Sequence, residues 1–449
     1  MATRVTDQIP DPSLDSRRPS GPAPQPAPQT GGRQGAFLRR TASKILTGLA
    51  ARFPDMPFSV TFWDGATERY GAGAPQFSIH IKTLAAAQRI LRDTGLGFAE
   101  AHMDGEIDIE GDLRALLKLQ YAPDIFNARD LSLWEKIRAG VTAVLHRNTL
   151  TRVRKNVSHH YDLRADFYRL WLDRSMTYTC AYFASPDDTL EQAQNNKHEH
   201  ICRKLRLEPG MSLVDIGCGW GAMLFYAAEH YGVQATGYTI SQEQYNWLRA
   251  EIDRRGMGDR VRVELKDYRQ VEGQFDRWVS IGMFEQVGSE YVRLFMETIT
   301  RALRPGGIGL LHTIGYRVRN FTNPWLTRYI FPGGFLPSLG EIVEPMNALN
   351  LNVFDVEDLR LHYGQTLDNW DDRFCQHIDT IRGMYGERFV RMWRLYLNGA
   401  ASSFRYGGSR LYQIAFSHGL ANDAPRTRTY LYNPPSDGDS LPRFDVKGV

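Results

Sequence analysis

At 449 residues the chain is long enough for two or three domains, and its near-balanced charge (54 Lys and Arg against 51 Asp and Glu) gives no reason to expect a nucleic-acid partner. Four cysteines without a C-x-x-C pair argue against a zinc site or a disulfide scaffold, so we expect no metal and a reducing compartment. The lack of a signal-peptide core and of any run of about 18 apolar residues predicts a cytoplasmic protein that meets lipid only peripherally, at the inner face of the membrane.

The N-terminal region changes character at residue 36. Residues 1–35 are rich in Pro, Gly and Ser and are predicted to form a disordered tail, because they cannot bury enough apolar surface to offset the entropy of ordering. The run AFLRRTASKILTGLAARF that follows has apolar residues near helical spacing among arginines and lysines. A basic amphipathic helix of this kind can lie on an anionic membrane, although a helix that covers a domain has the same pattern.

Residues 36–130 are predicted to form a small α+β domain. Alternating residues over 58–82, with Asp64-Gly65 as a hairpin turn, predict a small antiparallel sheet, and a helix is expected from Thr83 to Asp93. This domain carries no catalytic constellation of its own, and a role in lipid binding or dimer formation is expected for it. The acidic and histidine residues of its glycine-punctuated segment are interpreted as a polar loop and not as a ligand set: His102, Asp104 and Glu106.

The rest of the chain reads as a linker followed by an α/β domain. Residues 131–155 are predicted to be a basic helical linker, either a solvated helix face or a contact for phospholipid head groups. Thr189 and Gln192 form a capping-box pattern at the start of a helix. From residue 211 strands and helices alternate, which is typical of a doubly wound, mostly parallel sheet. We assign 156–423 to this catalytic domain and 424–449 to a C-terminal tail.

One stretch, LVDIGCGWG at 213–221, organises this domain. An apolar strand carries Asp215 into three glycines, Gly217, Gly219 and Gly221, and a helix follows. Glycine lets a ligand approach the backbone closely, and the helix N-terminus offers unpaired N–H groups. The stretch therefore predicts a site for a nucleoside-bearing cofactor.

The residues after the next two strands indicate which cofactor binds. A dinucleotide fold usually places an acid about 20 residues after the glycines, but this chain has uncharged residues at 237–241. Asp267, followed by Tyr268, stands after the third strand instead, where a carboxylate suits the amino group of an adenine. No lysine of a nucleoside-triphosphate loop follows the glycines. The pattern favours S-adenosylmethionine, with a nicotinamide cofactor as the weaker alternative.

Seven motifs then converge on one family. HHYDL (159–163), MTYTCAYF (176–183), VDIGCGWG (214–221), SIGMFEQVG (280–288), LLHTIG (310–315), IFPGGFLPS (330–338) and HYGQTL (362–367) occur in order. With them the chain resembles the cyclopropane-fatty-acid-phospholipid synthases and the related mycolic acid methyltransferases. The resemblance implies a class I S-adenosylmethionine methyltransferase, Rossmann-like, with a mostly parallel seven-stranded sheet and insertions that form a lipid tunnel.

The resemblance also implies site residues. The family holds a bicarbonate ion beside the reacting double bond, and its pocket maps onto Cys180, Glu285, His312, the Ile314 backbone and Tyr363. The cofactor contacts map onto Tyr178, Thr179, Gly217, Gly219, Thr239, Ile240, Gln244 and Tyr268, beside the Asp215 and Asp267 already named. Without the joint pattern, His312 would be interpreted as a core histidine and Cys180 as an inert buried thiol.

The chemistry that the resemblance implies accounts for these residue types. An alkene is a poor nucleophile, so alignment with the sulfonium methyl supplies much of the rate. Methyl transfer leaves a carbocation that aromatic faces can stabilise. Bicarbonate then removes a proton from the new methyl, with Glu285 accepting its hydroxyl proton while His312 and Tyr363 donate. The aromatic candidates are Tyr178, Tyr182, Phe183, Tyr316 and Phe331.

One departure from the family pattern leaves the product open. Many members read F-E-H-V-G, whereas this chain has Gln286 in place of the histidine, and glutamine cannot titrate. Loss of a different proton from the same cation gives methyl-branched or methylene-branched chains. The expected function is cyclopropanation of unsaturated phospholipid acyl chains at a membrane surface. Branched-chain methylation of the same acyl chains is the alternative. A homodimer is one of the oligomeric states considered.

Overall fold

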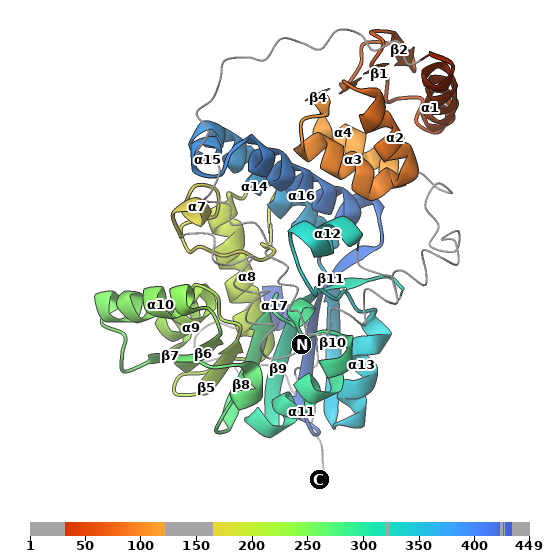
Figure 1. The fold of residues 1–449 in the computed structure, drawn as a ribbon. Coiled ribbons are helices and arrows are strands. Elements are labelled where there is room, and N and C mark those ends of the chain that lie inside the picture. The colour runs from red at the N-terminus through yellow and green to blue at the C-terminus, as the bar shows by residue number, and fades with distance from the viewer. Residues whose placement is uncertain (1–31, 122–164, 319–322, 423–424, 426, 433–449) are drawn as a thin grey trace, which may run out of the picture.

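The computed structural model describes residues 32–121, 165–318, 323–422, 425 and 427–432. In it a small N-terminal domain lies against helices of a larger α/β domain, on the side away from the main sheet (Figure 1). The first 31 residues of the predicted tail, the linker predicted at 131–155 and the motif HHYDL lie outside the described residues.

The N-terminal domain combines a four-stranded sheet with short helices, as expected. Its elements are α1 (Gly32–Arg52), β1 (Phe58–Thr61), β2 (Thr67–Tyr70), β3 (Phe77–Ile81), α2 (Leu84–Arg92), α3 (Thr94–Met103), β4 (Ile107–Gly111), α4 (Leu113–Lys118) and the 3-10 turn η1 (Leu119–Tyr121).

The small sheet is mixed, so the antiparallel prediction is wrong in part. The strand order is β2-β1-β3-β4, with β1 antiparallel to β2 across the expected hairpin but parallel to β3. After β2 the chain returns to the other edge of β1 instead of extending the hairpin. Gly71 makes this return possible, because its φ is 81° and a Cβ atom there would lie 2.9 Å from Pro57 Cα.

Two further expectations for this domain can be compared with the structure. The helix predicted from residue 36 begins at Gly32, so the last four residues of the predicted tail belong to α1. The polar loop prediction holds for Asp104 and Glu106, which lie between α3 and β4 and form ion pairs with Arg89 at 3.0 and 3.1 Å. It is wrong for His102, which lies within α3, is 8% exposed and has no hydrogen-bond partner at Nδ1 among the described residues. No group of residues suited to hold a metal ion is found in the described part of the chain.

The larger domain alternates helices and strands. Its elements are α7 (Ala165–Arg169), α8 (Leu190–Leu205), β5 (Ser212–Ile216), α9 (Ala222–Tyr231), β6 (Gln234–Thr239), α10 (Gln242–Arg255), β7 (Val261–Leu265), η3 (Tyr268–Gln270), β8 (Phe275–Ile281), η4 (Phe284–Gln286), η5 (Ser289–Tyr291), α11 (Val292–Ala302), β9 (Leu303–Tyr316), α12 (Pro324–Tyr329), α13 (Leu339–Ala348), β10 (Leu351–Asp358), α14 (Arg360–Gln376), α15 (Ile378–Tyr385), α16 (Glu387–Tyr406), β11 (Ser409–His418) and α17 (Thr429–Tyr432).

The predicted seven-stranded, mostly parallel sheet is confirmed. The order is β10-β11-β9-β8-β5-β6-β7, and β11 alone among these described strands runs against its neighbours. The carboxyl ends of β5, β6, β7 and β8 therefore meet at one edge of the sheet, the edge at which open α/β sheets bind ligands.

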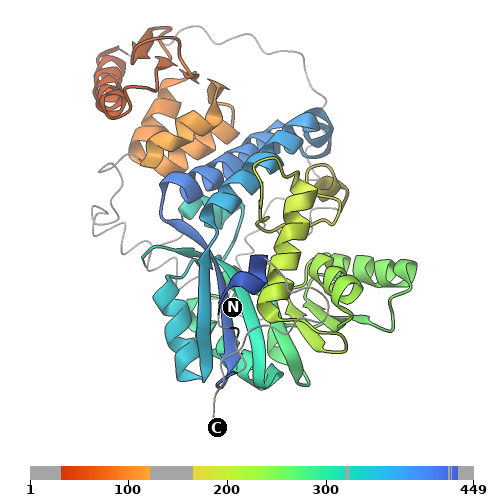
Figure 2. The ribbon, with the colours of Figure 1, turned by 180° about the vertical axis from the view of Figure 1, so that it is seen from behind.

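Local signals place the helices around this sheet. The predicted capping box at α8 is present, with Thr189 and Gln192 each satisfying the other's backbone N–H. The helices α14, α15 and α16 are inserted between β10 and β11 and form a layer above the carboxyl edge of the sheet (Figure 2).

The two domains share one interior. A single cluster of buried side chains runs from Phe58 and Phe77 in the small sheet to Trp370 and Trp393 in the inserted helices. The N-terminal domain is therefore packed as part of the same core, and not as an appended module.

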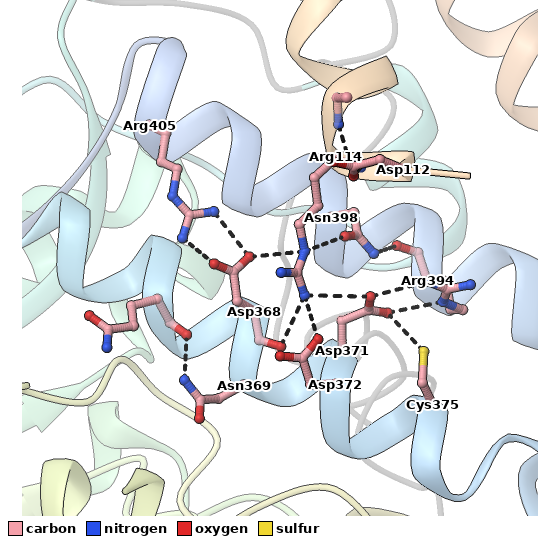
Figure 3. Close-up of polar contacts among 12 residues, drawn as sticks. Asp112, Arg114, Asp368, Asn369, Asp371, Asp372, Cys375, Arg394, Asn398 and Arg405 are labelled. Carbon is pink, nitrogen blue, oxygen red and sulfur yellow. Dashed lines mark hydrogen bonds and ion pairs between the residues drawn. The ribbon is translucent and has the colours of Figure 1, made fainter. Parts of the chain in front are cut away.

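Charged side chains close the boundary between the domains (Figure 3). Arg114 on α4 forms ion pairs with Asp372 at 2.6 Å and Asp368 at 3.3 Å, and it lies 3.9 Å from Asp371, all three on α14. Arg405 on α16 pairs with Asp368 from the other side. These contacts connect the N-terminal domain to the helix that also carries Tyr363.

Among the helices described, none is both long and apolar enough to cross a bilayer.

Candidate active site

The glycine loop joins β5 to α9 at the carboxyl edge of the sheet. Gly217, Gly219 and Gly221 have φ values of 77°, 56° and 81°, a region that L side chains rarely occupy. A Cβ atom on Gly217 would lie 2.6 Å from Met283, and one on Gly221 would lie 2.2 Å from Leu248, so these two glycines permit close packing. At Gly219, apart from the glycine itself and its two chain neighbours, no atom of the described chain lies within 4 Å of that position. Gly219 therefore presents open backbone to a ligand.

All ten residues predicted to contact the cofactor surround one cavity beside this loop. They come from the segment before α8, the end of β5, the end of β6 with the first turn of α10, and the end of β7. The set is Tyr178, Thr179, Asp215, Gly217, Gly219, Thr239, Ile240, Gln244, Asp267 and Tyr268.

Hydrogen bonds hold the rim of this cavity in place. Thr239 Oγ1 donates to Gln244 Oε1 at 2.8 Å, which ties the end of β6 to α10. At the end of β7, Asp267 Oδ1 accepts from the backbone N–H of Arg269 at 3.0 Å. An acceptor beside the Tyr268 ring suits a flat heterocycle with an amino group. The open backbone and these groups fit a nucleoside such as that of S-adenosylmethionine.

Glu285 lies in the turn η4, just beyond β8. Its Oε1 accepts a hydrogen bond from Ile314 N at 2.6 Å, whereas Oε2 is buried and has no hydrogen-bond partner in the described residues. Burial raises the pKa of Glu285 to about 7. A carboxyl group that titrates near neutrality, with one oxygen unsatisfied, is suited to exchange a proton with a small polar ligand.

His312 lies on β9, the strand next to β8 in the sheet. It pairs in register with Ile281 at the end of β8 and with Gln413 on β11. Its Nδ1 lies 3.2 Å from Gln413 Nε2, and its buried Nε2 contacts no hydrogen-bonding group of the described chain. Burial, with help from Lys197 and Lys204, lowers the pKa of His312 well below its ordinary range. The imidazole is therefore neutral at pH 7 and can donate from one nitrogen only.

Cys180 and Tyr363 belong to a second group, on the side of α14. Ala181 N donates to Thr366 Oγ1 at 3.0 Å, and Thr366 Oγ1 lies 4.0 Å from Cys180 Sγ. Thr366 stands three residues after Tyr363, on the same side of α14. Burial raises the pKa of the Cys180 thiol, so this group stays protonated and does not act as a nucleophile.

In the described part of the chain, none of the five predicted catalytic residues is among those that line the cavity. Glu285 contacts Ile314 directly, and His312 stands two residues before Ile314 on the same strand. Residues within two positions of Cys180 and Glu285 do line the cavity, namely Thr179, Met283 and Gln286. Ile281, the register partner of His312, lines it as well.

The five aromatic candidates do not gather at one place. The hydroxyl groups of Tyr178 and Tyr396 form a hydrogen bond of 2.9 Å. Phe331 packs edge-on against the ring of Tyr396, with the ring centroids 5.5 Å apart. Tyr182 and Phe183 stack instead on His362. Tyr316 packs over Gly408, where a Cβ atom would lie 2.4 Å from its ring. The candidates thus form two pairs, Tyr178 with Phe331 around Tyr396 and Tyr182 with Phe183 around His362.

Three residues of this region were not predicted from the sequence: Lys197, Thr366 and Gln413. Lys197 lines the cavity from the buried side of α8, and a lysine on the apolar face of a helix was a signal that could have found it. Gln413 and Thr366 contact predicted residues from strands and helices more than 100 residues away in sequence. No local pattern marks such contacts.

A family model described as mycolic acid cyclopropane synthetase matches residues 148–414, and a model described as a domain of unknown function matches residues 45–127. The cyclopropane-fatty-acyl-phospholipid synthase of Escherichia coli K12 is 36% identical over 364 residues, which cover 78% of this chain and 90% of that protein.

Two further relatives differ in what they are named for. A probable fatty acid methyltransferase of Pseudomonas putida is 34% identical over 390 residues, covering 84% of this chain and 96% of that protein. A mycolic acid cyclopropane synthase solved with S-adenosylhomocysteine and CTAB aligns with a TM-score of 0.55 and 35% identity, covering 59% of this chain and 98% of that one.

Proposed function

The chain belongs to the mycolic acid cyclopropane synthetase family and is an S-adenosylmethionine-dependent methyltransferase, and from this we propose that it converts the cis double bond of an unsaturated phospholipid acyl chain into a cyclopropane ring. The observation that carries the proposal is the pair of buried, unsatisfied polar atoms, Glu285 Oε2 and His312 Nε2, beside a cavity suited to S-adenosylmethionine. In an otherwise apolar site, such atoms support a small polar ligand at the reacting carbon.

Residues around the cavity would position the two reactants and stabilise the cation that methyl transfer creates. Thr179 and Gly219 border the cavity where the methyl donor would lie, and alignment of donor and alkene supplies much of the rate. The rings of Tyr178 and Phe331, which share Tyr396 as a neighbour, offer faces to a carbocation on the acyl chain.

We propose that bicarbonate is the small ligand of Glu285 and His312. When bound, it supplies a base compact enough to work beside an acyl chain. Glu285 orients it by accepting its hydroxyl proton, because the Glu285 carboxyl titrates near neutrality and has one free oxygen. His312 donates from its unpartnered Nε2, with Gln413 contacting the opposite ring nitrogen.

A second product is supported by one residue. Gln286, which replaces the histidine of many family members, lines the cavity next to Glu285. A change of hydrogen-bonding group here alters which proton of the cation is nearest to a base. Methyl-branched or methylene-branched acyl chains are the alternative product, and the relative from Pseudomonas putida named a fatty acid methyltransferase is consistent with it.

We further propose that α1 holds the protein at an anionic phospholipid surface on the cytoplasmic side of the membrane. The helix lies on the part of the N-terminal domain farthest from the main sheet (Figure 1). Phe37 and Ile45 are 68% and 52% exposed, and α1 contains no acidic residue. Arg39 is engaged with Asp64 and Glu68. Four other basic residues of α1 are exposed and form no ion pair with described residues: Arg33, Arg40, Lys44 and Arg52.

Product analysis tests the reaction. The protein is incubated with S-adenosylmethionine and phosphatidylglycerol vesicles carrying oleoyl chains, and the released fatty esters are analysed by mass spectrometry. Cyclopropanation adds one CH₂ and removes the double bond. Addition of one CH₂ with the double bond retained would select the branched product, and unmodified lipid would overturn the proposal.

Vesicle flotation tests the membrane contact separately. Replacing the four exposed basic residues of α1 with glutamine should weaken binding to phosphatidylglycerol vesicles by about 1 kcal/mol per residue at most, and should leave binding to phosphatidylcholine vesicles unchanged. The matched control replaces the engaged Arg39. Equal binding of the fourfold variant and the native protein would exclude α1 as the contact. Light scattering in the same buffers reports whether the protein is a homodimer.

A further inference from the structure

His362 lies on α14, directly before Tyr363, and its side chain is half-buried. Its Nδ1 accepts a hydrogen bond from the backbone N–H of Phe183 at 3.0 Å. A backbone N–H can only donate, so Nδ1 must carry a lone pair and the imidazole must be neutral, with its proton on Nε2. The contact therefore exists in only one protonation state of His362.

A second bond joins the same two parts of the chain. Ala181 N donates to Thr366 Oγ1 on α14 at 3.0 Å. The backbone N–H of Tyr182 donates in another direction, to the carbonyl oxygen of Ala193 on α8 at 2.9 Å. Residues 180–183, which we call the Cys180 segment, are therefore fixed between two helices by successive backbone N–H groups.

Tyr182 lies between two histidine rings. It stacks on His362 with ring centroids 4.7 Å apart and on His200 of α8 with centroids 4.5 Å apart. His200 Nε2 lies 2.8 Å from Glu357 Oε2 on β10, and Lys204 pairs with the same carboxylate at 2.5 Å. The two imidazoles thus face different partners, because a carboxylate can accept from His200 whereas a backbone donor faces His362.

We propose that neutral His362 is a positioning residue that holds the Cys180 segment against the helix of Tyr363, and that its protonation releases this segment. The inference rests on the proposed catalytic roles of Cys180 and Tyr363, because His362 acts through them. Protonation would place an N–H on Nδ1 opposite the N–H of Phe183, and two donors cannot bond each other. Thr179, which directly precedes the segment, lines the cofactor cavity, so release should also reach the cofactor.

The groups around His362 favour its neutral form. Burial lowers the pKa of His362, with Glu357 opposing this shift and His200 adding to it. The phenols of Tyr182 and of Tyr432, which packs on His200 from α17, stay protonated because burial raises the pKa of each. Protonation of His362 is therefore expected only in acidic solution.

Amide hydrogen exchange of the native protein at pH 5.0 and pH 7.5, measured by mass spectrometry, tests the release. After correction for the intrinsic pH dependence of exchange, peptides that contain the Cys180 segment should exchange about tenfold faster at pH 5.0. His362→Asn offers an oxygen near the place of Nδ1, an acceptor that does not titrate, and should abolish this difference. His362→Phe keeps an aromatic ring but no acceptor, and should exchange rapidly at both pH values. His377→Asn, at the exposed end of α14, is the matched control and should behave as the native protein does.

Turnover reports whether the release reaches the site. The ratio of kcat for His362→Asn to kcat for the native protein should rise about threefold or more from pH 7.5 to pH 5.0, since the titration of Glu285 is common to both proteins and cancels. A constant ratio would overturn the positioning role.

Equal exchange of the native protein at both pH values would overturn the proposal, as would a pH dependence that persists in His362→Asn. Should His362→Asn fail to fold, as judged by circular dichroism, the exchange of the native protein at the two pH values decides. The exchange measurements need neither lipid nor turnover. Unmodified lipid in the vesicle assay would therefore refute the proposed function without deciding whether His362 holds the segment.

Discussion

The burial of Glu285 predicts that Glu285→Gln stabilises the ligand-free protein, and more so at high pH. The folded-state pKa of Glu285 is about 7, above the ordinary 4.5, so the folded state binds the proton more tightly than the unfolded chain does. The contribution of this protonation to the free energy of unfolding is complete below pH 4.5 and is lost as the pH rises through 7. Glutamine carries no charge to desolvate, and its Oε1 can still accept from Ile314 N.

The magnitude follows from the difference in pKa. A shift of 2.5 units (7 − 4.5) corresponds to about 3 kcal/mol once the carboxyl is ionised in both states, at pH 8. At pH 5.5 the folded carboxyl is still protonated and the difference falls to about 1 kcal/mol. The advantage of Glu285→Gln should therefore grow by about 2 kcal/mol between these two pH values.

Urea unfolding followed by tryptophan fluorescence, at pH 5.5 and pH 8.0 in bicarbonate-free buffer, measures this advantage. Glu344→Gln, at an exposed position of α13, controls for the general loss of one negative charge. Turnover of the Glu285 variant should be lost although its stability rises. The assignment of a raised pKa to Glu285 would be refuted by either of two results. The variant could gain the same free energy of unfolding at both pH values, or it could be less stable than the native protein at pH 8.0.

Three other substitutions probe the surroundings of the site. Gln413→Leu removes the amide beside Nδ1 of His312, so kcat should fall about tenfold or more with little change in S-adenosylhomocysteine affinity; an unchanged kcat would contradict the positioning role. Arg114→Ala leaves carboxylates of α14 without their cation at the domain boundary, and should lower stability by about 1–3 kcal/mol in urea unfolding, more at low than at high salt. Gly282→Ala forces a Cβ atom to within 2.8 Å of Thr179 Cγ2 at a φ of 69°, and calorimetry should show weaker cofactor binding; normal affinity would show that the segment before α8 can move aside.

Local sequence patterns identified most of the regular elements because each rests on short-range physics. The capping box at Thr189 requires residues three apart, and the glycine turn after β5 requires backbone that only glycine adopts easily. The alternation of apolar strands and helices was sufficient to predict a mostly parallel sheet. The resemblance to a family, carried by seven motifs, directed attention to Glu285 and His312, which a pattern of apolar residues alone would have left in the core.

Strand pairing was where local patterns failed. The hairpin at Asp64-Gly65 was predicted, but the return of β3 to the far edge of β1 was not, because a six-residue connection between strands does not specify the edge it reaches. For the same reason the row formed by His312 and Gln413 on β9 and β11 is invisible in sequence. Such contacts depend on which strands become neighbours after the whole sheet has assembled.

The sequence by itself thus determined the class of fold, the glycine loop and the residue types that a methyl-transfer site requires, since these depend on backbone geometry and on chemistry carried by single side chains. Only the tertiary structure decided that Lys197 and Asp215 are both buried in the wall of one cavity. It also decided that the N-terminal domain shares a core with the helices above the site. Burial and electrostatic partners are properties of the assembled molecule, because segments far apart in the chain supply the low-dielectric surroundings that shift a pKa or leave a donor for a ligand.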